Sequence, residues 1–572
     1  MTRHTTRRIL TQGKIKSEAS LSMDDIDKRL GSYHDPKACI LDNECGVDSL
    51  SSRNGVPLRA NAPLRTSPHA QDCYRVRHFS RDVLHLSSTS LWIVPIKYQC
   101  SPRCFSHFIW DLFAKPRVSK LHGITAQHSC LFRCLDFVHR AHVLHPLESL
   151  TFSRTGFVDS TSARIVFRNP GAQDPLQLIY TNPARPATKG IDVALLTEDS
   201  DYTGTIELTG LNPGTRYVYN ISGGLAGSFT TSAESLKKFT VISTSCQKPF
   251  YPYSPLSHSL AIPGLSHLAR YVESAPPEFI LFLGDFIYSD LPTQIEPLTT
   301  KYYRQLYRQI YASPSWTRTL RDLPWIHIFD DHEFINDYHP GIAGGEDIYT
   351  SAMSPFEDYQ GAANPPRSDS DRRKKYTQFR RGDASFFVLD TRTYRATPPA
   401  KADGGSGRRS MLGTEQLQEL LVWITNEKGW KVIVSGVPMT RNWSEGSDEM
   451  DSWAGYLEER QVIFEALWRV GGGVIISGDR HEHATVKFSP PHPHPASHTI
   501  IEFSTSPLSF FYQPFLREYV SHDETIFNLP QGASKFGQLT FDSSDEKTWI
   551  VGFELVVDGE KVWHYNHSWK RM

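Results

Sequence analysis

The chain has 572 residues, of which 39% are hydrophobic and 22% are charged, a composition typical of a globular protein with two or three domains. Lysine plus arginine number 61 and aspartate plus glutamate 62, so the net charge is −1. This balance gives no electrostatic case for nucleic acid or an anionic membrane as the main partner. No run of about 18 apolar residues predicts a membrane-spanning helix.

Residues 1–148 show no sustained helical or strand periodicity, and they are predicted to form a poorly structured extension of unknown role. Seven of the eight cysteines lie in the first quarter of the chain. The pairs Cys100–Cys104 and Cys130–Cys134 have a spacing that fits a zinc site poorly. No apolar segment follows the first basic residues, so no signal peptide is recognised. The compartment and the oligomeric state stay open.

Residues 150–235 carry short strand patterns that Asn-Pro and Pro-Gly turns separate. Segments 163–168 and 205–208 predict strands, and the turn at 212–214 leads into a further alternating strand. The pattern resembles an immunoglobulin-like or fibronectin-like sandwich, so a small all-β domain is predicted here. It contains no cluster of chemically reactive residues, which favours a packing or spacer role.

Residues 239–572 have an α/β pattern. Near-continuous apolar runs predict strands that are buried on both faces. These runs are residues 239–243, 279–283, 325–329, 386–389, 431–434 and 473–476. Helical periodicity predicts helices between them, at residues 301–311, 414–425 and 458–468. Segments 341–375 and 397–412 are rich in Gly, Pro, Ser and Arg, and they are predicted to be loops near the site.

Polar residues follow most of these strands at the point where each strand ends. Open α/β sheets bind ligands outside the carboxyl ends of their strands, so these residues are expected to meet on one rim. They are Cys246, Asp285, Tyr288, Asp330, Asp331, His332, Glu333, Arg392, Arg395, Asp479, Arg480, His481 and His483. Carboxylates suit hard ions such as Ca²⁺, Mg²⁺ or Mn²⁺, whereas a thiolate with a tyrosinate suits a ferric ion.

Each group of strand-end residues has a second interpretation. Segment 330–333 packs three carboxylates around an imidazole, which is costly without a cation unless the turn is solvated. In segment 479–483 an aspartate and two histidines alternate, so they share one face if the segment is extended. Cys246 either binds metal or packs as a small buried side chain. Arg392 and Arg480 either clamp a phosphate or form ion pairs.

Taken together, these strand ends resemble the alkaline phosphatase D family of metallophosphoesterases, also called PhoD-like, over roughly 239–525. The motifs that carry the resemblance are residues 245–247, 284–288, 330–333, 389–395 and 477–481. The resemblance implies a metallophosphoesterase-type αββα sandwich with a metal centre at the strand ends. It also implies that residues 150–235 are the family's amino-terminal β-sandwich.

The resemblance further implies which residues act. The implied metal ligands are Cys246, Asp285, Tyr288, Asp330 or Asp331, Asp479 and His481, and the implied catalytic residues are His332, Arg480 and Arg392. The implied metals are Fe³⁺ and Ca²⁺, with Mg²⁺, Mn²⁺ and Zn²⁺ as alternatives. Residues 245–247 read Ser-Cys-Gln where many metallophosphoesterases have Asp-x-His, so the generic two-metal scheme does not transfer directly. Family members are often secreted or membrane-associated.

The resulting hypothesis is metal-dependent hydrolysis of phosphate esters, by an alkaline phosphatase or phosphodiesterase. A metal-activated water would attack phosphorus, His332 would assist protonation of the leaving group, and Arg480 or Arg392 would hold the phosphate. The alternative is a non-catalytic metal-containing protein that binds a phosphate ligand or a partner. A ferric enzyme of different chemistry is a third hypothesis. The natural substrate does not follow from the sequence.

Overall fold

The structure is a computed structural model of the chain, and it describes residues 120–367, 374–398, 409–441, 451–510 and 522–571. All of these residues belong to one compact unit, Ser90–Met572. Within these ranges every helix is too short or too polar to cross a bilayer. Cys100 and Cys104 lie outside the described residues, so the cysteine spacing considered for zinc stays untested.

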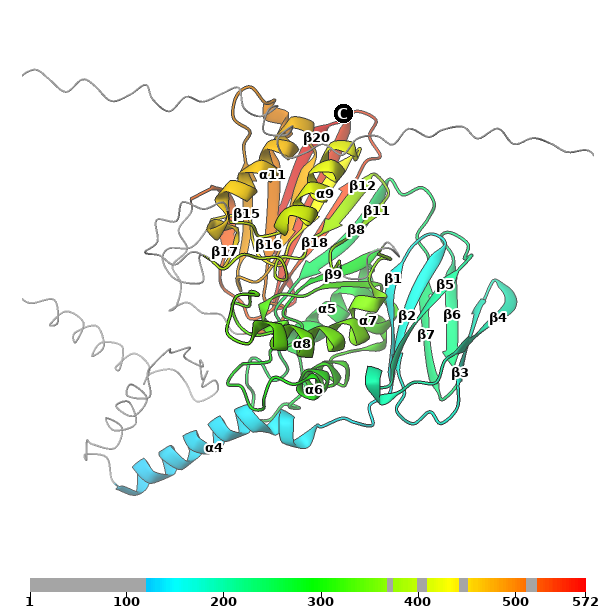
Figure 1. Cartoon of the computed structure of the whole chain (residues 1–572), viewed down its shortest axis with the longest axis vertical. Helices are drawn as coiled ribbons and strands as arrows, with labels where there is room; N and C mark the ends of the chain where they lie inside the picture. The colour runs from blue at the N-terminus through cyan, green and yellow to red at the C-terminus, as the bar shows by residue number, and fades with distance from the viewer. Residues whose placement is uncertain (1–119, 368–373, 399–408, 442–450, 511–521, 572) are drawn as a thin grey trace, which may run out of the picture. The chain divides into compact units, whose positions relative to one another are not determined.

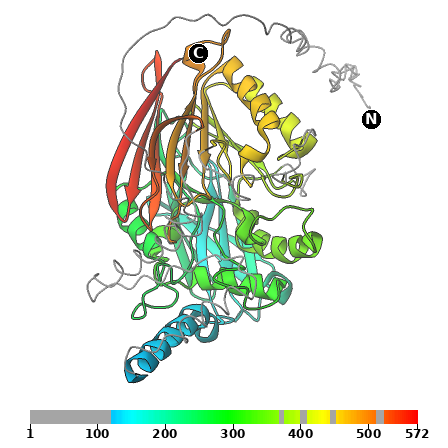
Figure 2. The same ribbon diagram turned by 90° about the vertical axis from the view of Figure 1, so that its left-hand side faces the viewer.

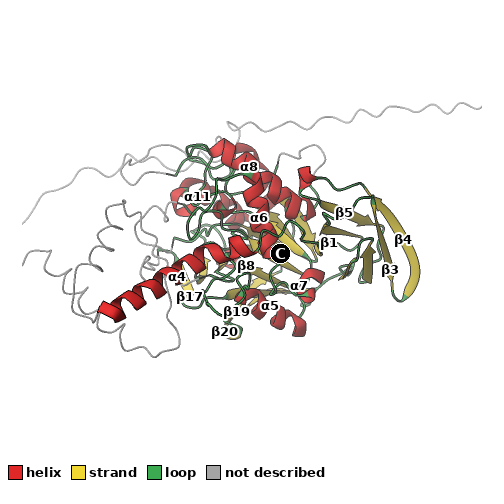
Figure 3. Ribbon diagram, turned by 90° about the horizontal axis from the view of Figure 1, so that it is seen from below, coloured by secondary structure: helices red, strands yellow, loops and turns green. Residues whose placement is uncertain are grey.

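Helix α4 (Lys120–Leu144) lies in the segment for which the sequence predicted no regular structure. Its carboxyl-terminal half packs on the main body of the protein (Figures 1 and 3). The ring of Phe137 lies 4.9 Å from that of Tyr251, and Asp136 accepts a hydrogen bond from the Tyr253 hydroxyl at 2.9 Å. These partners are more than 100 positions away in the chain, so local periodicity could not reveal contacts that stabilise the helix.

Residues 152–230 form two antiparallel sheets around one shared core (Figure 1). The strand orders are β1-β2-β5 and β4-β3-β6-β7. The strands are β1 (Phe152–Val158), β2 (Ser162–Arg168), β3 (Leu176–Asn182), β4 (Arg185–Val193), β5 (Thr203–Thr209), β6 (Arg216–Ile221) and β7 (Leu225–Thr230). Ile165 of the first sheet and Leu178 of the second are fully buried between the sheets. The sequence patterns identified β2 and β5, and the alternating segment after the turn at 212–214 is β6.

Two larger sheets organise the rest of the chain. Their strand orders are β10-β9-β8-β18-β19-β20 and β11-β12-β13-β14-β16-β15-β17. The strands are β8 (Lys238–Thr244), β9 (Phe279–Leu283), β10 (Trp325–Ile328), β11 (Thr377–Arg381), β12 (Ala384–Val388), β13 (Trp430–Val434), β14 (Gly473–Ser477), β15 (His483–Phe488), β16 (Ile500–Thr505), β17 (Glu524–Leu529), β18 (Lys535–Asp542), β19 (Thr548–Val557) and β20 (Glu560–Lys570). Strands β8, β9 and β10 are parallel, as are β12, β13, β14 and β16. The carboxyl ends of each parallel set therefore share one edge of their sheet.

The two large sheets face each other across an apolar core, and helices cover their outer faces (Figures 1 and 2). Consecutive residues of β8 show the arrangement: Val241 packs between the sheets and Ile242 packs under the helices. The helices on the first sheet are α5 (Pro263–Ser274), α6 (Thr300–Tyr311), α7 (Arg318–Asp322) and α8 (Gly345–Tyr359), and those on the second are α9 (Gly413–Asn426) and α11 (Leu457–Val470). Burial on both faces explains the near-continuous apolar runs, and the predicted mixed α/β class is confirmed.

The predicted helices correspond to α6, α9 and α11. The prediction of loops over 341–375 is wrong where α8 forms. This helix begins after Gly344, contains Pro355, and buries Phe356 and Tyr359. Its glycine and proline content resembles that of a loop, but the tertiary contacts of its apolar face outweigh the low helix propensity.

A buried ion cluster joins the β-sandwich to the main domain. Asp201, between β4 and β5, is contacted by Arg168 of β2 at 3.0 Å and by Arg308 of α6 at 2.7 Å. The hydroxyl of Tyr359 of α8 donates to the same carboxylate. Burial opposes ionisation of Asp201, but Arg168, Tyr359 and Arg308 together lower its pKa. The two smaller sheets and helices α6 and α8 are therefore held together by charge as well as by packing.

Candidate metal centre

The carboxyl ends of strands from both large sheets meet at one place, as the sequence predicted. The Ser245 hydroxyl accepts the N–H of Asp479 at 3.0 Å, which links the end of β8 to the end of β14. The N–H of Cys246 donates to the carbonyl of Gly284 after β9 at 3.2 Å. These bonds bring the motifs of three strands to one rim.

Residues of different chemistry form what we call the mixed-donor group. The Cys246 sulfur, a carboxylate oxygen of Asp285 and a ring nitrogen of His481 lie within 4.8 Å of one another. The Tyr288 hydroxyl donates to Asp285 at 2.9 Å and contacts His481 Nε2 at 3.2 Å. Burial raises the pKa of both Cys246 and Tyr288 well above the ordinary values. A thiol, a phenol, an imidazole and a carboxylate within this distance suit a transition metal.

Three aspartates form a second set, which we call the carboxylate group. Oxygens of Asp330, Asp331 and Asp479 lie within 4.8 Å of one another. Burial raises the pKa of Asp330 and of Asp479, whereas His332 and Arg392 outweigh burial and lower the pKa of Asp331 to about 2. Among the described residues, Asp330 Oδ2 is buried and has no hydrogen-bond partner. A hard cation would satisfy that oxygen and stabilise the charged carboxylates, so the residues fit such an ion.

The backbone at four predicted ligands is left-handed. The φ angles are 61° at Cys246, 55° at Asp285, 71° at Asp479 and 57° at His481. Such angles are uncommon for residues other than glycine and cluster at functional sites. They also correct the prediction for 479–483, because a segment with two left-handed residues is not extended and its side chains do not share one face.

His483 illustrates that correction. It begins β15, and its ring nitrogens contact the hydroxyls of Thr505 and Thr485, each at 3.0 Å. Its ring stacks on Phe553 with centroids 5.0 Å apart. Burial, with a smaller effect of Lys535, lowers the pKa of His483 to about 3. His483 is therefore a neutral core residue and lies outside both donor groups.

Gly284 allows the loops after β9 and β10 to approach closely. Its φ angle is +96°, and a Cβ atom there would lie 2.4 Å from Cβ of Asp330. A side chain would therefore be strained and would displace Asp330. The requirement for glycine comes from the neighbouring loop, in addition to the turn that the sequence suggested.

Glu333 ties the same two loops together. Its buried carboxylate accepts the N–H groups of Phe286 at 2.6 Å, Asp330 at 2.7 Å and Asp285 at 2.9 Å. Burial outweighs these bonds and raises the pKa of Glu333 to about 7. Because it accepts backbone donors and belongs to neither donor group, Glu333 holds the loops that carry the predicted ligands. The sequence placed it in an acidic cluster without revealing this role.

His332 pairs with a residue that the sequence did not single out. Its Nδ1 lies 2.7 Å from Asp290 Oδ1, and the other oxygen of Asp290 accepts the N–H of Asn336 at 3.1 Å. Burial disfavours the charged ring, but Asp290, Asp331 and Asp285 outweigh it and raise the pKa of His332 to about 10. Asp290 lies only two positions after Tyr288, and that proximity was the available signal.

Arg392 is enclosed by acidic residues. Its Nε donates to Asp330 at 2.5 Å, and its two terminal nitrogens donate to the carboxylate of Asp451, each at 2.9 Å. The side chain is 0% exposed. These contacts differ from the phosphate-binding role predicted from the sequence, because every nitrogen already donates within the protein. Arg480 instead lies three residues after the end of β14, and its Nε lies 3.2 Å from Asp479.

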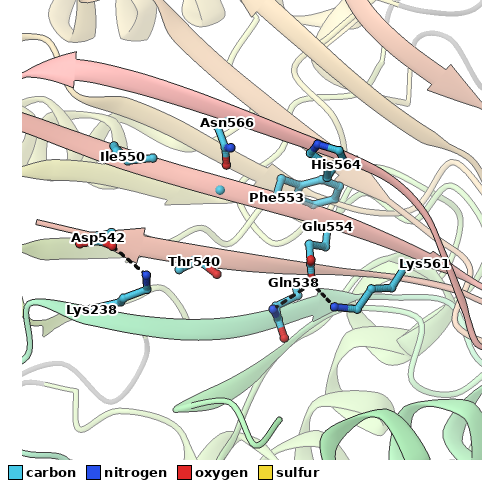
Figure 4. Close-up of a pocket in the computed structure, with 11 residues that line it drawn as sticks. Lys238, Gln538, Thr540, Asp542, Ile550, Phe553, Glu554, Lys561, His564 and Asn566 are labelled. Carbon is cyan, nitrogen blue, oxygen red and sulfur yellow. Dashed lines mark hydrogen bonds and ion pairs between the residues drawn. The ribbon is translucent and has the colours of Figure 1, made fainter. Parts of the chain in front are cut away.

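A polar hollow of about 470 Å³ lies elsewhere, over β8, β18, β19 and β20 (Figure 4). Its charged residues pair with each other: Lys238 with Asp542 at 2.9 Å and Lys561 with Glu554 at 2.7 Å. None of the strand-end residues lines it. The hollow therefore contributes nothing to the chemistry of the donor groups.

Fold and site together define a mixed α/β protein that carries clustered candidate metal ligands at its strand ends. Residues 241–543 match the PhoD-like phosphatase family, so the chain belongs to this family. It is 26% identical over 317 residues to alkaline phosphatase D of Bacillus subtilis (strain 168), an alignment that covers 48% of this chain and 52% of that protein. The chain thus spans about half the length of this curated relative.

A solved structure of PhoD has a similar fold. The two structures align with a TM-score of 0.56 at 17% sequence identity. The alignment covers 73% of this chain and 90% of that one. At this identity the likeness shows a shared fold, and the chemistry has to be argued from the residues themselves.

Proposed function

We propose that this protein hydrolyses phosphate esters, as an alkaline phosphatase or phosphodiesterase that depends on bound metal. The observation that carries the proposal is the presence of both donor groups on one rim, in a chain that belongs to the PhoD-like family. The two facing sheets with outer helices support a metallophosphoesterase-type αββα sandwich. The antiparallel sheets at 152–230 support an immunoglobulin-like domain before it.

The mixed-donor group, with Cys246, Asp285, Tyr288 and His481, suits Fe³⁺, and the carboxylate group suits Ca²⁺, Mg²⁺ or Mn²⁺. A metal ion bound in such sites lowers the pKa of water and stabilises charge on phosphoryl oxygens. Of the aspartate pair we favour Asp331 as the ligand. It belongs to three of the four donor sets in the described chain, whereas Asp330 belongs to one.

His332 is the proposed proton donor to the leaving group. Asp290 engages its Nδ1, so Nε2 is the atom that would deliver the proton to the leaving oxygen. The neighbouring carboxylates keep the ring protonated in the metal-free protein, and bound cations would reduce that effect. Arg480, which follows β14 in the same loop as Asp479 and His481, is the proposed phosphate contact.

The experiment is hydrolysis of a chromogenic phosphomonoester and a phosphodiester by the purified full-length chain, at several pH values on both sides of neutrality. Each assay is run before and after treatment with chelator, and after metal is restored. Asp285→Ala should lose bound metal and turnover, because it removes a carboxylate shared by two donor sets. Asp542→Ala is the control, since its carboxylate contacts the exposed Lys238 and the N–H of Ser544, neither of which belongs to a donor group.

The proposal is supported if chelator abolishes turnover, added metal restores it and Asp285→Ala lacks it. The rates on the two substrates then rank the two classes of ester. Metal bound in stoichiometric amount without turnover of either ester would instead favour a non-catalytic phosphate-binding protein. Unchanged turnover by Asp285→Ala would refute the assignment of this rim.

A further inference from the structure

Lys535 is a buried lysine beside the mixed-donor group that belongs to none of the strand-end motifs. It begins β18, the strand that pairs with β8, and it is 0% exposed. Its Nζ donates to the carbonyl of Gly532 at 2.7 Å and to the carbonyl of His481 at 3.3 Å. A lysine is rarely buried unless its nitrogen is bound; these two carbonyls bind the Lys535 nitrogen, and the carboxylates of Glu482 and Asp558 favour its charged form.

The bond to His481 supports an unfavourable backbone conformation. His481 has a φ angle of 57°, which is uncommon for a residue other than glycine. Its peptide is held on both sides, because its N–H donates to the Ser506 hydroxyl at 2.7 Å and its carbonyl accepts from Lys535. This conformation brings His481 Nε2 to 3.2 Å from the Tyr288 hydroxyl.

The backbone of Lys535 is itself fixed to the site. Its N–H donates to the carbonyl of Pro507 at 2.6 Å, and its carbonyl accepts from the Thr244 hydroxyl at 2.8 Å. Thr244 is the last residue of β8, two positions before Cys246. The amino group therefore has a set position relative to both the cysteine and the histidine of the mixed-donor group.

We infer that Lys535 is a positioning residue for the mixed-donor group: by holding the His481 carbonyl, it fixes the direction of the His481 ring and so the affinity for metal. The inference rests on the proposed function, because it assumes that this group binds metal. An ammonium and a neutral amine both donate hydrogen bonds, so the role does not depend on the protonation of Lys535. It requires contact with neither substrate nor metal.

The test is titration of the metal-free full-length protein with Co²⁺, followed by the thiolate-to-cobalt charge-transfer absorption. Lys535→Met keeps the length of the side chain and removes the donor. Lys431→Met is the matched control: Lys431 is also buried, and its Nζ donates to the Gly471 carbonyl at 3.2 Å, but it lies near the amino end of β13. Cys246→Ser identifies the absorption band.

Lys535→Met is expected to bind Co²⁺ about 10–100-fold more weakly than the wild type, the usual effect of removing a residue that orients a ligand. Lys431→Met should bind it as the wild type does. Wild-type affinity in Lys535→Met would overturn the inference. A wild-type protein without any thiolate band would instead show that the metal centre of the proposed function is wrong, so the two failures are distinguishable.

Circular dichroism shows whether Lys535→Met folds. If it does not fold, Lys535→Gln takes its place, because its amide nitrogen falls about one bond short of the position of Nζ. A tenfold or greater weakening of Co²⁺ binding in Lys535→Gln supports the positioning role. Affinity within about twofold of the wild type in this variant overturns it.

Discussion

The carboxylate of Glu333 should be needed both for the stability of the phosphatase domain and for metal binding. It accepts three backbone N–H groups, two at Oε2 and one at Oε1. In Glu333→Gln the single carbonyl oxygen can retain at most two of them, and the amide N–H₂ group faces the third. One buried donor is then left without an acceptor.

The magnitude follows from these contacts. A buried donor without an acceptor costs about 1–3 kcal/mol, and each remaining bond weakens by roughly 1 kcal/mol when the acceptor loses its charge. The free energy of unfolding of Glu333→Gln should therefore fall by about 3–5 kcal/mol. The loops that carry Asp285 and Asp330 would also separate, so the metal content per chain should fall.

The assay is urea unfolding followed by tryptophan fluorescence at about pH 9, above the pKa of about 7 of Glu333, together with metal analysis of the purified protein. Glu459→Gln is a matched control. Glu459 is also buried and accepts two backbone N–H groups, from Met411 and Leu412, but both bonds use one oxygen. A glutamine can retain both with a weaker, uncharged acceptor, so about 2 kcal/mol should be lost, less than in Glu333→Gln. Equal stability and metal content in wild type and Glu333→Gln would refute the role given to these three bonds.

Three further variants test other contacts. Gly284→Ala should lose metal and activity, as metal analysis and ester hydrolysis would show, because its Cβ would lie 2.4 Å from Cβ of Asp330. Arg392→Lys should lower kcat and reduce the free energy of unfolding by about 3 kcal/mol with KM unchanged, whereas a phosphate clamp would raise KM. Asp201→Asn should destabilise by about 3 kcal/mol in urea, because it leaves two buried arginines without a carboxylate. Burial raises the pKa of Asp201, but its partners outweigh burial and lower it. The wild type therefore has this stabilisation in full above about pH 4 and loses it as the pH falls through the lowered pKa. If Asp201→Asn lost stability in acid as the wild type does, the role given to the Asp201 carboxylate would be contradicted.

Much of the main domain could be predicted because its strands are buried on both faces. A run such as 279–283 needs no knowledge of its partners to be recognised as a strand, and β9 has the predicted bounds. Helix α4 is the opposite case. Its stability depends on contacts such as Phe137 with Tyr251, and a sequence pattern does not contain partners from distant positions.

The candidate site was predictable as a set of residue types, and its geometry was not. The sequence placed Asp479 and His481 on alternate positions, and alternation implies one face only where the backbone is extended. The packing of strand ends instead imposes left-handed angles at both residues. Arg392 shows the same limit: its strand-end position suggested a ligand clamp, but its acceptor Asp451 lies 59 positions further along the chain.

The distribution of cations around the two donor groups links these observations. Buried carboxylates and a thiol that lie close together without metal would resist ionisation. Each donor group is contacted by one buried basic side chain. Arg392 supports the carboxylate group through Asp330, and Lys535 supports the mixed-donor group through His481. Both side chains are 0% exposed, so neither is accessible to a phosphate ester. Substitution of Arg392 and substitution of Lys535 should therefore weaken the binding of different metal ions, and metal analysis of the two variants would distinguish them.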